Sequence, residues 1–311
     1  LVLEATRRAI GFTLPLLALT FLAYAAYGYT LPDWLFPNRG YNWERIVSQT
    51  FLHSQGVFGI ALKVMFTYVF LFVLFGTILA AIIALIIATP LAIGVALVIS
   101  HYAPRRIARF LGYLIDLLAA VPSVVYGLWG RETLQGWVFP VYDWLHDNLG
   151  FLPFFEGPVT TGRTILTAGV VLAVMALPII TALCREVFLQ TPVMHQEAAL
   201  ALGATRWEMI RMAVFPYSRS GITSAVMLGL GRALGETMAV AMVLSAAGGV
   251  TINLISSQNP STIAANIALN YANASGTKTN VLIAGGLVLF VVTFAVNFLG
   301  RWLAARGQVK A

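Results

Sequence analysis

The sequence contains little charge. Of its 311 residues, 10% are Asp, Glu, Lys or Arg and 59% are hydrophobic, whereas about a quarter of a typical soluble domain is charged. This scarcity excludes a sizeable soluble domain. It predicts an all-α, multi-pass membrane protein with a single membrane domain.

Cysteine is nearly absent as well. Cys184 is the only one, so no disulfide can form within the chain, and the four histidines show no metal-ligand spacing. We therefore expect no metal site. The net charge of +7 would favour an anionic partner if it were clustered, but basic residues in an apolar chain usually report membrane topology. No nucleic-acid partner is expected.

Two kinds of catalytic motif are missing from the sequence. No G-x-x-x-x-G-K-[S/T] occurs, so the chain cannot hold nucleotide phosphates in a P-loop. No Ser/His, paired-Asp or His-Glu-x-x-His arrangement lies within the apolar runs. These absences disfavour an enzyme and predict that any ATP hydrolysis belongs to another polypeptide.

The long apolar runs define the predicted membrane spans. A span needs about 20 apolar residues, and about six such runs lie near 9–29, 66–100, 108–130, 164–184, 220–247 and 281–302. The second run is ambiguous, because residues 57–100 are almost continuously apolar. It forms either one long helix kinked at Pro90 or two fused spans.

The distribution of basic residues favours one crossing in that run. With one crossing, Arg7 and Arg8 lie on the same side as most later basic segments, which include 105–109, 185–219 and 301–310. Two crossings would place those segments opposite the N-terminus, against the positive-inside tendency. We therefore expect both termini in the cytoplasm.

The segment 185–222 is predicted to form a helix, a bend and a second helix. The Thr191-Pro192 step can start a helix, Gly203 interrupts it, and Pro216 is expected to stop the amphipathic turn that follows. The pattern alone fits a surface loop against the bilayer equally well.

A family resemblance narrows the interpretation of this segment. Glu197, Ala198 and Ala199, then Gly203, then a hydrophobic residue before Pro216 resemble the EAA loop of ABC-importer permeases. The resemblance implies that the loop, at 185–219, forms a coupling helix that docks in a groove of an ATPase subunit. A rigid helix joined to two spans can transmit the closure of that ATPase.

Several further stretches resemble the permeases of phosphate-specific ABC importers, the PstC-like family, over about residues 75–311. They are 83–106, 114–130, 197–216 and 229–244. The resemblance implies a type I importer core of MetI-like fold in a bacterial cytoplasmic membrane. It implies a PstA-like second permease, a PstB-like ATPase dimer that carries ATP and Mg, and an extracytoplasmic phosphate-binding protein. No cofactor is expected in this chain.

The first 75 residues resemble part of a fused permease subunit of TRAP transporters, which are driven by ions. We therefore expect an N-terminal anchor and outer loop of atypical origin at 1–75, an importer domain at 76–311, and a junction around Phe75 to Ala80. Two alternatives to an ATP-driven importer stay open. They are an ion-driven secondary transporter and a membrane scaffold that transports nothing itself.

Arg232 and Glu236 are charged residues in an otherwise apolar run. A central Arg costs about 2.5–3.5 kcal/mol in a span, so it normally faces a cavity or a partner. In a continuous helix Glu236, four residues later, would lie on the same face. Either the two neutralise each other, or Arg232 contacts phosphate in transit while Glu236 orients it and competes with the anion. The resemblance favours the second role.

Small residues and prolines supply the other predicted features. Gly231 and Gly235 are expected to let another helix approach closely. Prolines within the spans loosen the backbone hydrogen bonding and predict kinks or hinges; they are Pro90, Pro122 and Pro178. Asp116 either pairs with an Arg across the bundle or lies hydrated near the cytoplasmic interface.

Overall fold

The computed structural model describes residues 13–30, 32, 39–48, 73–156, 159–245, 251–274 and 277–306. The chain divides into two compact units, Leu1–Thr67 and Tyr68–Ala311. Within the described ranges every regular element is a helix, which confirms the predicted all-α class. The predicted junction at 75–80 lies inside a helix of the second unit, and its origin stays a prediction.

The first unit contains the apolar helix α2, Thr13–Tyr27, followed by the 3-10 turn η1, Gly28–Thr30, and the short helix α3, Trp43–Val47. Tyr27 and Trp43 pack edge to face with ring centroids 6.2 Å apart. Tyr41 donates its backbone N–H to Ala25, at 3.0 Å. The described part of α2 has 15 residues, and the start of the predicted span 9–29 lies outside the described residues.

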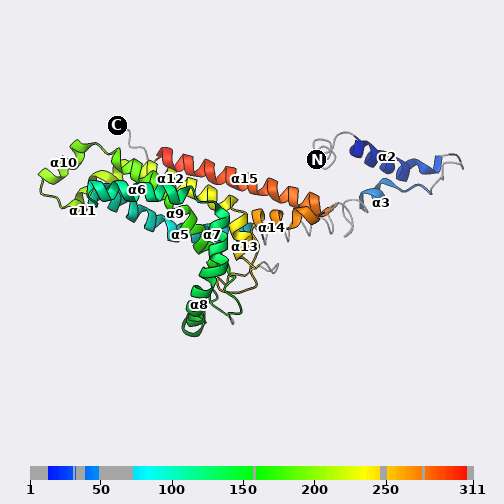
Figure 1. Cartoon of the computed structure of the whole chain (residues 1–311). Helices are drawn as coiled ribbons and strands as arrows, with labels where there is room; N and C mark the ends of the chain where they lie inside the picture. The colour runs from blue at the N-terminus through cyan, green and yellow to red at the C-terminus, as the bar shows by residue number, and fades with distance from the viewer. Residues whose placement is uncertain are drawn as a thin grey trace. The chain divides into compact units, whose positions relative to one another are not determined.

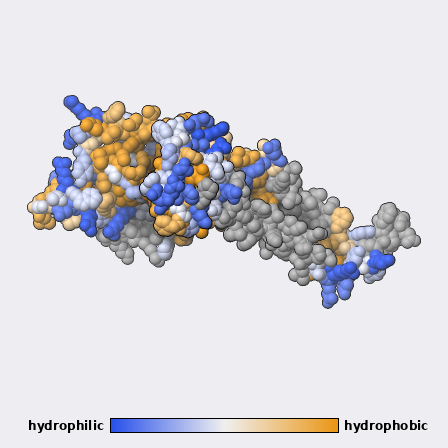
Figure 2. Space-filling model, turned by 90° about the horizontal axis from the view of Figure 1, so that it is seen from below, coloured by the Kyte–Doolittle hydropathy of each residue, from blue (hydrophilic) through white to orange (hydrophobic). Residues whose placement is uncertain are grey.

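The second unit is built around two long helices, α5 (Leu74–Leu97) and α9 (Ile165–Leu189); α12 (Phe215–Gly235) packs against both, and α15 (Thr277–Arg306) packs against α12 (Figure 1). α5 carries an alanine at every fourth position, and all five are at most 1% exposed: Ala80, Ala84, Ala88, Ala92 and Ala96. Because methyl side chains let helix backbones approach closely, this stripe sets the packing of α5. On the face shown in Figure 2, hydrophobic residues of this unit form an exposed area with hydrophilic residues at its edges.

Three helices in the described part of the chain are long and apolar enough to cross a membrane. They are Leu74–Tyr102, Ile165–Leu189 and Thr279–Trp302, and they confirm three predicted spans. The first combines α5 with the π turn η5, Val98–Tyr102, and keeps Pro90 inside one continuous helix. The described part of this run is therefore one helix, and the choice between one and two crossings, which also involves residues 57–72 outside the described ranges, stays a prediction.

The predicted span at 108–130 is broken near Pro122, where the sequence predicted a kink or hinge. Helix α6, Arg105–Ala119, ends before Pro122, and α7, Ser123–Trp129, continues through the π turn η6, Gly130–Leu134, into α8, Gln135–Leu149. The two parts are bent by 89° (Figure 1). Pro122 causes the break, because proline disfavours helical backbone at the preceding residue and lacks an N–H.

The predicted span at 220–247 is also interrupted. α12 ends at Gly235, Glu236 is extended with φ −69° and ψ 126°, and the short helix α13 covers Met238–Val243. The Thr237 hydroxyl donates to the Gly235 carbonyl at 3.2 Å, and the Glu236 carboxylate accepts from the Ala239 N–H at 3.1 Å. The break exists because these side chains satisfy the freed backbone groups.

Segment 251–262 is tied to the start of α9 by one buried side chain. The Asn259 amide oxygen accepts from the Ile165 N–H at 3.2 Å, and its nitrogen donates to the Arg163 carbonyl at 3.0 Å. The segment leads into α14, Ile263–Asn270, whose first N–H bonds to the Thr77 hydroxyl of α5 at 2.9 Å. These bonds fix the end of the bundle that lies away from the coupling loop.

Candidate transport pathway and coupling loop

The loop that follows α9 forms the predicted helix, bend and helix. Helix α10 covers Val193–Ala201 with Pro192 as its N-cap residue, and α11 covers Arg206–Met209. Gly203 between them has φ +85°, a left-handed conformation that glycine adopts without the steric cost of a Cβ. The bend therefore depends on Gly203, the residue at which the sequence predicted the helix to be interrupted.

A capping box fixes the start of α11. The Thr205 hydroxyl accepts from the Glu208 N–H at 3.3 Å, and the Glu208 carboxylate accepts from the Thr205 N–H at 2.7 Å. The backbone N–H and the hydroxyl of Thr205 lower the pKa of Glu208 from its usual value. Sequence reasoning missed this pair, although the Thr-x-x-Glu spacing is a known helix-start signal.

Pro216 does not stop the amphipathic turn, contrary to prediction. α11 continues through a π turn, η7 (Ile210–Val214), directly into α12, where Pro216 is the second residue. Proline has no backbone N–H to donate. Because the wider π turn before Pro216 needs no hydrogen bond from that position, the helix can continue past the proline. The loop is thus joined to α12 without a flexible link.

Helix α10 stands out from the rest of the unit (Figure 1) and contains no buried residue. Glu197 and Ala198 are exposed, and Ala199 is half-buried against the core. Large apolar side chains around it are exposed as well: Val193, Met194, Leu200 and Leu202. Exposed apolar patches of this kind are typical of surfaces that contact another protein or a membrane.

Aromatic side chains join the loop to three helices. Trp207 packs edge to face on Phe215 at 6.3 Å between centroids, and Phe215 packs on Phe188 at 6.1 Å. Phe188, at the end of α9, is fully buried and contacts His101 of η5 at 6.4 Å. These contacts form one continuous row from α11 through α12 and α9 to η5. Residues so far apart in sequence give no local signal that could have predicted this row.

Arg232 and Glu236 do not lie on one helical face, which corrects the prediction. Because the chain leaves the helix at Glu236, that carboxylate caps α13, and no ion pair among the described residues includes either side chain. Both residues are half-buried. The charge of Arg232 acts on the Tyr126 hydroxyl, which itself donates to the Leu118 carbonyl at 2.8 Å across the α6–α7 break.

The glycine contacts differ from those expected. A Cβ on Gly229 would lie 2.7 Å from Ile180 of α9, so the close helix approach occurs there. A Cβ on Gly231 or Gly235 would meet no atom of the described chain within 4 Å. The packing role of Gly231 and Gly235 therefore stays a prediction.

The other predicted residues fall in two settings. Pro90 and Pro178 lie inside α5 and α9, whereas Pro122 lies at the α6–α7 break, and their role as hinges stays a prediction. Asp116 lies 3.9 Å from Arg185 of α9, which fits the predicted pairing with an Arg; its side chain is 52% exposed, and its position relative to the cytoplasmic interface stays a prediction. Within the described residues no cluster of His, Cys, Asp or Glu could hold a metal ion.

These features define a membrane component of a transporter that is driven through a docked partner. The family model described as "Binding-protein-dependent transport system inner membrane component" matches residues 88–308. The chain belongs to this family, and it is a multi-pass permease subunit rather than an enzyme.

The curated relatives specify the family further. The chain is 50% identical over 223 residues to "Phosphate transport system permease protein PstC 2" of Mycobacterium tuberculosis, a match that covers 70% of this chain and 68% of that protein. It is 42% identical over 222 residues to "Phosphate transport system permease protein PstC" of Xylella fastidiosa, covering 69% and 67%.

Solved structures agree on the fold. The chain is similar to a chain of the MetNI methionine ABC transporter in an inward-facing conformation, with a TM-score of 0.51 and 18% identity over 76% of this chain and 93% of that one. A bacterial ABC transporter that imports the acidic polysaccharide alginate gives a TM-score of 0.51 and 15% identity over 98% and 99%. These likenesses confirm the MetI-like permease fold.

Proposed function

We propose that the chain conducts inorganic phosphate through the cytoplasmic membrane of a bacterium, as a permease subunit of an ATP-driven importer. Its relatives at 40–50% identity are named as phosphate transport permeases. The observation that carries the proposal is the setting of Arg232, a half-buried guanidinium next to a broken helix and without a carboxylate partner among the described residues.

Arg232 suits a phosphate group in three ways. It is always charged, its planar N–H donors match two phosphate oxygens, and its weak hydration lowers the cost of partial burial. Glu236 lies at the break, where its carboxylate can either cap α13 or approach the guanidinium when the backbone rearranges. Such competition would let the permease release the anion that it has bound.

The energy for transport would come from partner proteins. We propose a PstA-like second permease, a PstB-like ATPase dimer that holds ATP and Mg, and an extracytoplasmic phosphate-binding protein. The exposed apolar surface of α10, with Glu197, Ala198 and Ala199, would dock on the ATPase. The row of aromatic contacts would carry its movement to α9 and α12. We also propose that α10 and both termini lie in the cytoplasm.

The role of Arg232 can be tested in vesicles that contain the complete complex. Arg232→Ala should lower labelled-phosphate uptake about 10- to 100-fold, which corresponds to the loss of one charge-assisted hydrogen bond. Arg232→Lys should recover it only partly, since an ammonium group lacks the planar donors. Arg301→Ala, at an exposed position near the end of α15 and outside the coupling loop, is the control. Normal uptake by Arg232→Ala in an assembled complex would refute the role.

A further inference from the structure

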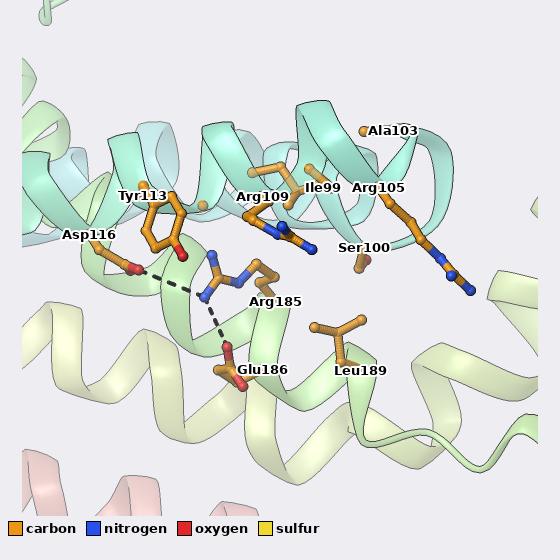
Figure 3. Close-up of a pocket in the computed structure, with 12 residues that line it drawn as sticks. Ile99, Ser100, Ala103, Arg105, Arg109, Tyr113, Asp116, Arg185, Glu186 and Leu189 are labelled. Atoms are coloured by element: carbon orange, nitrogen blue, oxygen red, sulfur yellow. Dashed lines mark hydrogen bonds and ion pairs between the residues drawn. The ribbon is translucent and has the colours of Figure 1, made fainter.

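A second basic site lies at the end of the bundle that carries α10. A cavity of about 510 Å³ opens between η5, α6 and α9 (Figure 3). Arg105 and Arg109 of α6 and Arg185 of α9 line it. Arg185 is four residues before the last residue of α9, so the cavity is next to the junction with the coupling loop.

The positive charges of this cavity are only partly neutralised. Both carboxylates that line it contact the same guanidinium: Arg185 Nη2 lies 2.9 Å from Glu186 Oε1 and 3.9 Å from Asp116 Oδ2. No ion pair among the described residues includes Arg105 or Arg109. Two guanidinium groups on one cavity wall therefore have no carboxylate partner, a charge distribution that favours an anion with several oxygen atoms.

Gly112 shapes the floor of the cavity. It is buried on α6, and a Cβ at this position would lie 2.3 Å from Arg185 Nη1. The guanidinium of Arg185 therefore lies directly against the α6 backbone. Glycine here allows α9 to place a third positive charge beside the arginines of α6, which a larger residue would displace.

The remainder of α6 is suited to contact with lipid. Beyond its basic first turns it exposes large apolar side chains to its surroundings: Phe110, Leu114 and Leu117. Tyr113 is 69% exposed and also lines the cavity. An amphipathic helix that joins a basic cavity to an exposed apolar surface fits a molecule with an anionic head and hydrocarbon chains.

We propose that this cavity binds the phosphate headgroup of an anionic phospholipid, with Arg105 and Arg109 as its main contacts and the acyl chains along Phe110, Leu114 and Leu117. The assignment to the cytoplasmic leaflet rests on the proposed function, whereas binding itself does not. Anionic lipids are abundant in that leaflet. A lipid held there would join α6 to α9 beside the coupling loop.

The test is lipid retention by the purified complex, measured by native mass spectrometry after equilibration with equal amounts of phosphatidylglycerol and phosphatidylcholine. The wild type should retain phosphatidylglycerol at least fivefold over phosphatidylcholine. Arg105→Gln/Arg109→Gln should abolish this preference. Arg106→Gln is the matched control, because Arg106 is exposed on the same helix turn and does not line the cavity; it should leave the preference unchanged.

Thermal unfolding and the binding of inorganic phosphate test the same proposal independently. Phosphatidylglycerol should raise the thermal unfolding midpoint of the wild type and of Arg106→Gln but not of the double variant, whose folding is checked by size-exclusion chromatography. The proposal would be overturned if Arg106→Gln lost the preference for phosphatidylglycerol as fully as the double variant, or if the wild type showed no such preference. So would saturable binding of labelled inorganic phosphate in neutral detergent that is lost in the double variant, since the site would then belong to a free anion. None of these readouts requires phosphate transport, so failure here leaves the proposed function standing.

Discussion

Gly229 and Gly231 lie two residues apart on α12 in different surroundings. Gly229 faces the fully buried Ile180, whereas Gly231 has open space around it. Gly229→Ala should therefore destabilise the chain by about 1–3 kcal/mol, the usual cost of overpacking. Gly231→Ala should leave stability equal or slightly higher, because alanine is the better helix former. Thermal unfolding of the chain purified alone in detergent measures both, and equal effects would contradict the packing described.

The same pair separates contacts within the chain from contacts with another chain. Gly231→Leu should leave the unfolding temperature of the isolated chain unchanged, because its surroundings are open. It should reduce co-purification of the second permease if that partner packs at Gly231 and Gly235. Full co-purification of the second permease with Gly231→Leu would contradict the predicted packing role of Gly231 and Gly235.

Sequence reasoning identified Arg232 and Glu236 but not their geometry. Two charges in an apolar run are visible from residue type alone. The prediction of a shared face assumed a continuous helix, yet the capping bond from Ala239 and the bond from Thr237 stabilise an extended Glu236. Such local competition between side chains and helix hydrogen bonds is not fixed by spacing.

At the scale of elements, the bend of the coupling loop depends on Gly203. Gly203→Ala should strain the backbone by about 1 kcal/mol at φ +85° and change the angle between α10 and α11. We expect ATP hydrolysis to continue with reduced phosphate uptake, measured as ATP consumed per phosphate transported. Gly136→Ala, at an open position in α8, is the control. An unchanged ratio in Gly203→Ala would contradict the coupling role.

The capping box gives a prediction that depends on pH. The pKa of Glu208 is lowered in the folded chain. The stability that the ionised carboxylate contributes to α11 is therefore fully present above the pKa of Glu208 in the unfolded chain, and it is lost as the pH falls through the lowered pKa of the folded chain. Thr205→Ala removes the hydroxyl but keeps the backbone N–H, so it should raise the pKa of Glu208 part of the way towards its usual value and weaken this acid dependence of α11. Carboxyl-selective NMR titration of labelled protein measures it. An unchanged pKa would contradict the hydrogen bonds described.

Local signals explain which elements the sequence predicted well. Three long apolar runs became spans, and α10 starts and ends where Pro192 and Gly203 indicated. The π turns η6 and η7 were missed because they carry no local signature. Pro122 indicated a kink in the run at 108–130, but the size of the bend between α6 and α7, 89°, is not fixed by residue type.

At the scale of the whole molecule, the missed features all join residues distant in sequence. The Asn259 bonds to the start of α9, the aromatic row from Trp207 to His101, and the cavity between α6 and α9 each depend on tertiary packing. Periodicity and motif spacing are local and cannot predict them. The family resemblance could predict the fold and the coupling loop because it rests on contiguous motifs.

The central claim is ATP-driven phosphate import, and its most direct test is labelled-phosphate uptake by vesicles containing the chain, a second permease, the ATPase dimer and the phosphate-binding protein. We predict uptake that requires ATP and the binding protein, resists competition by sulfate and molybdate, and fails in Arg232→Ala. Uptake that follows a sodium or proton gradient without ATP would instead identify an ion-driven transporter, and an assembled complex without phosphate flux would identify a scaffold; either result would contradict the account.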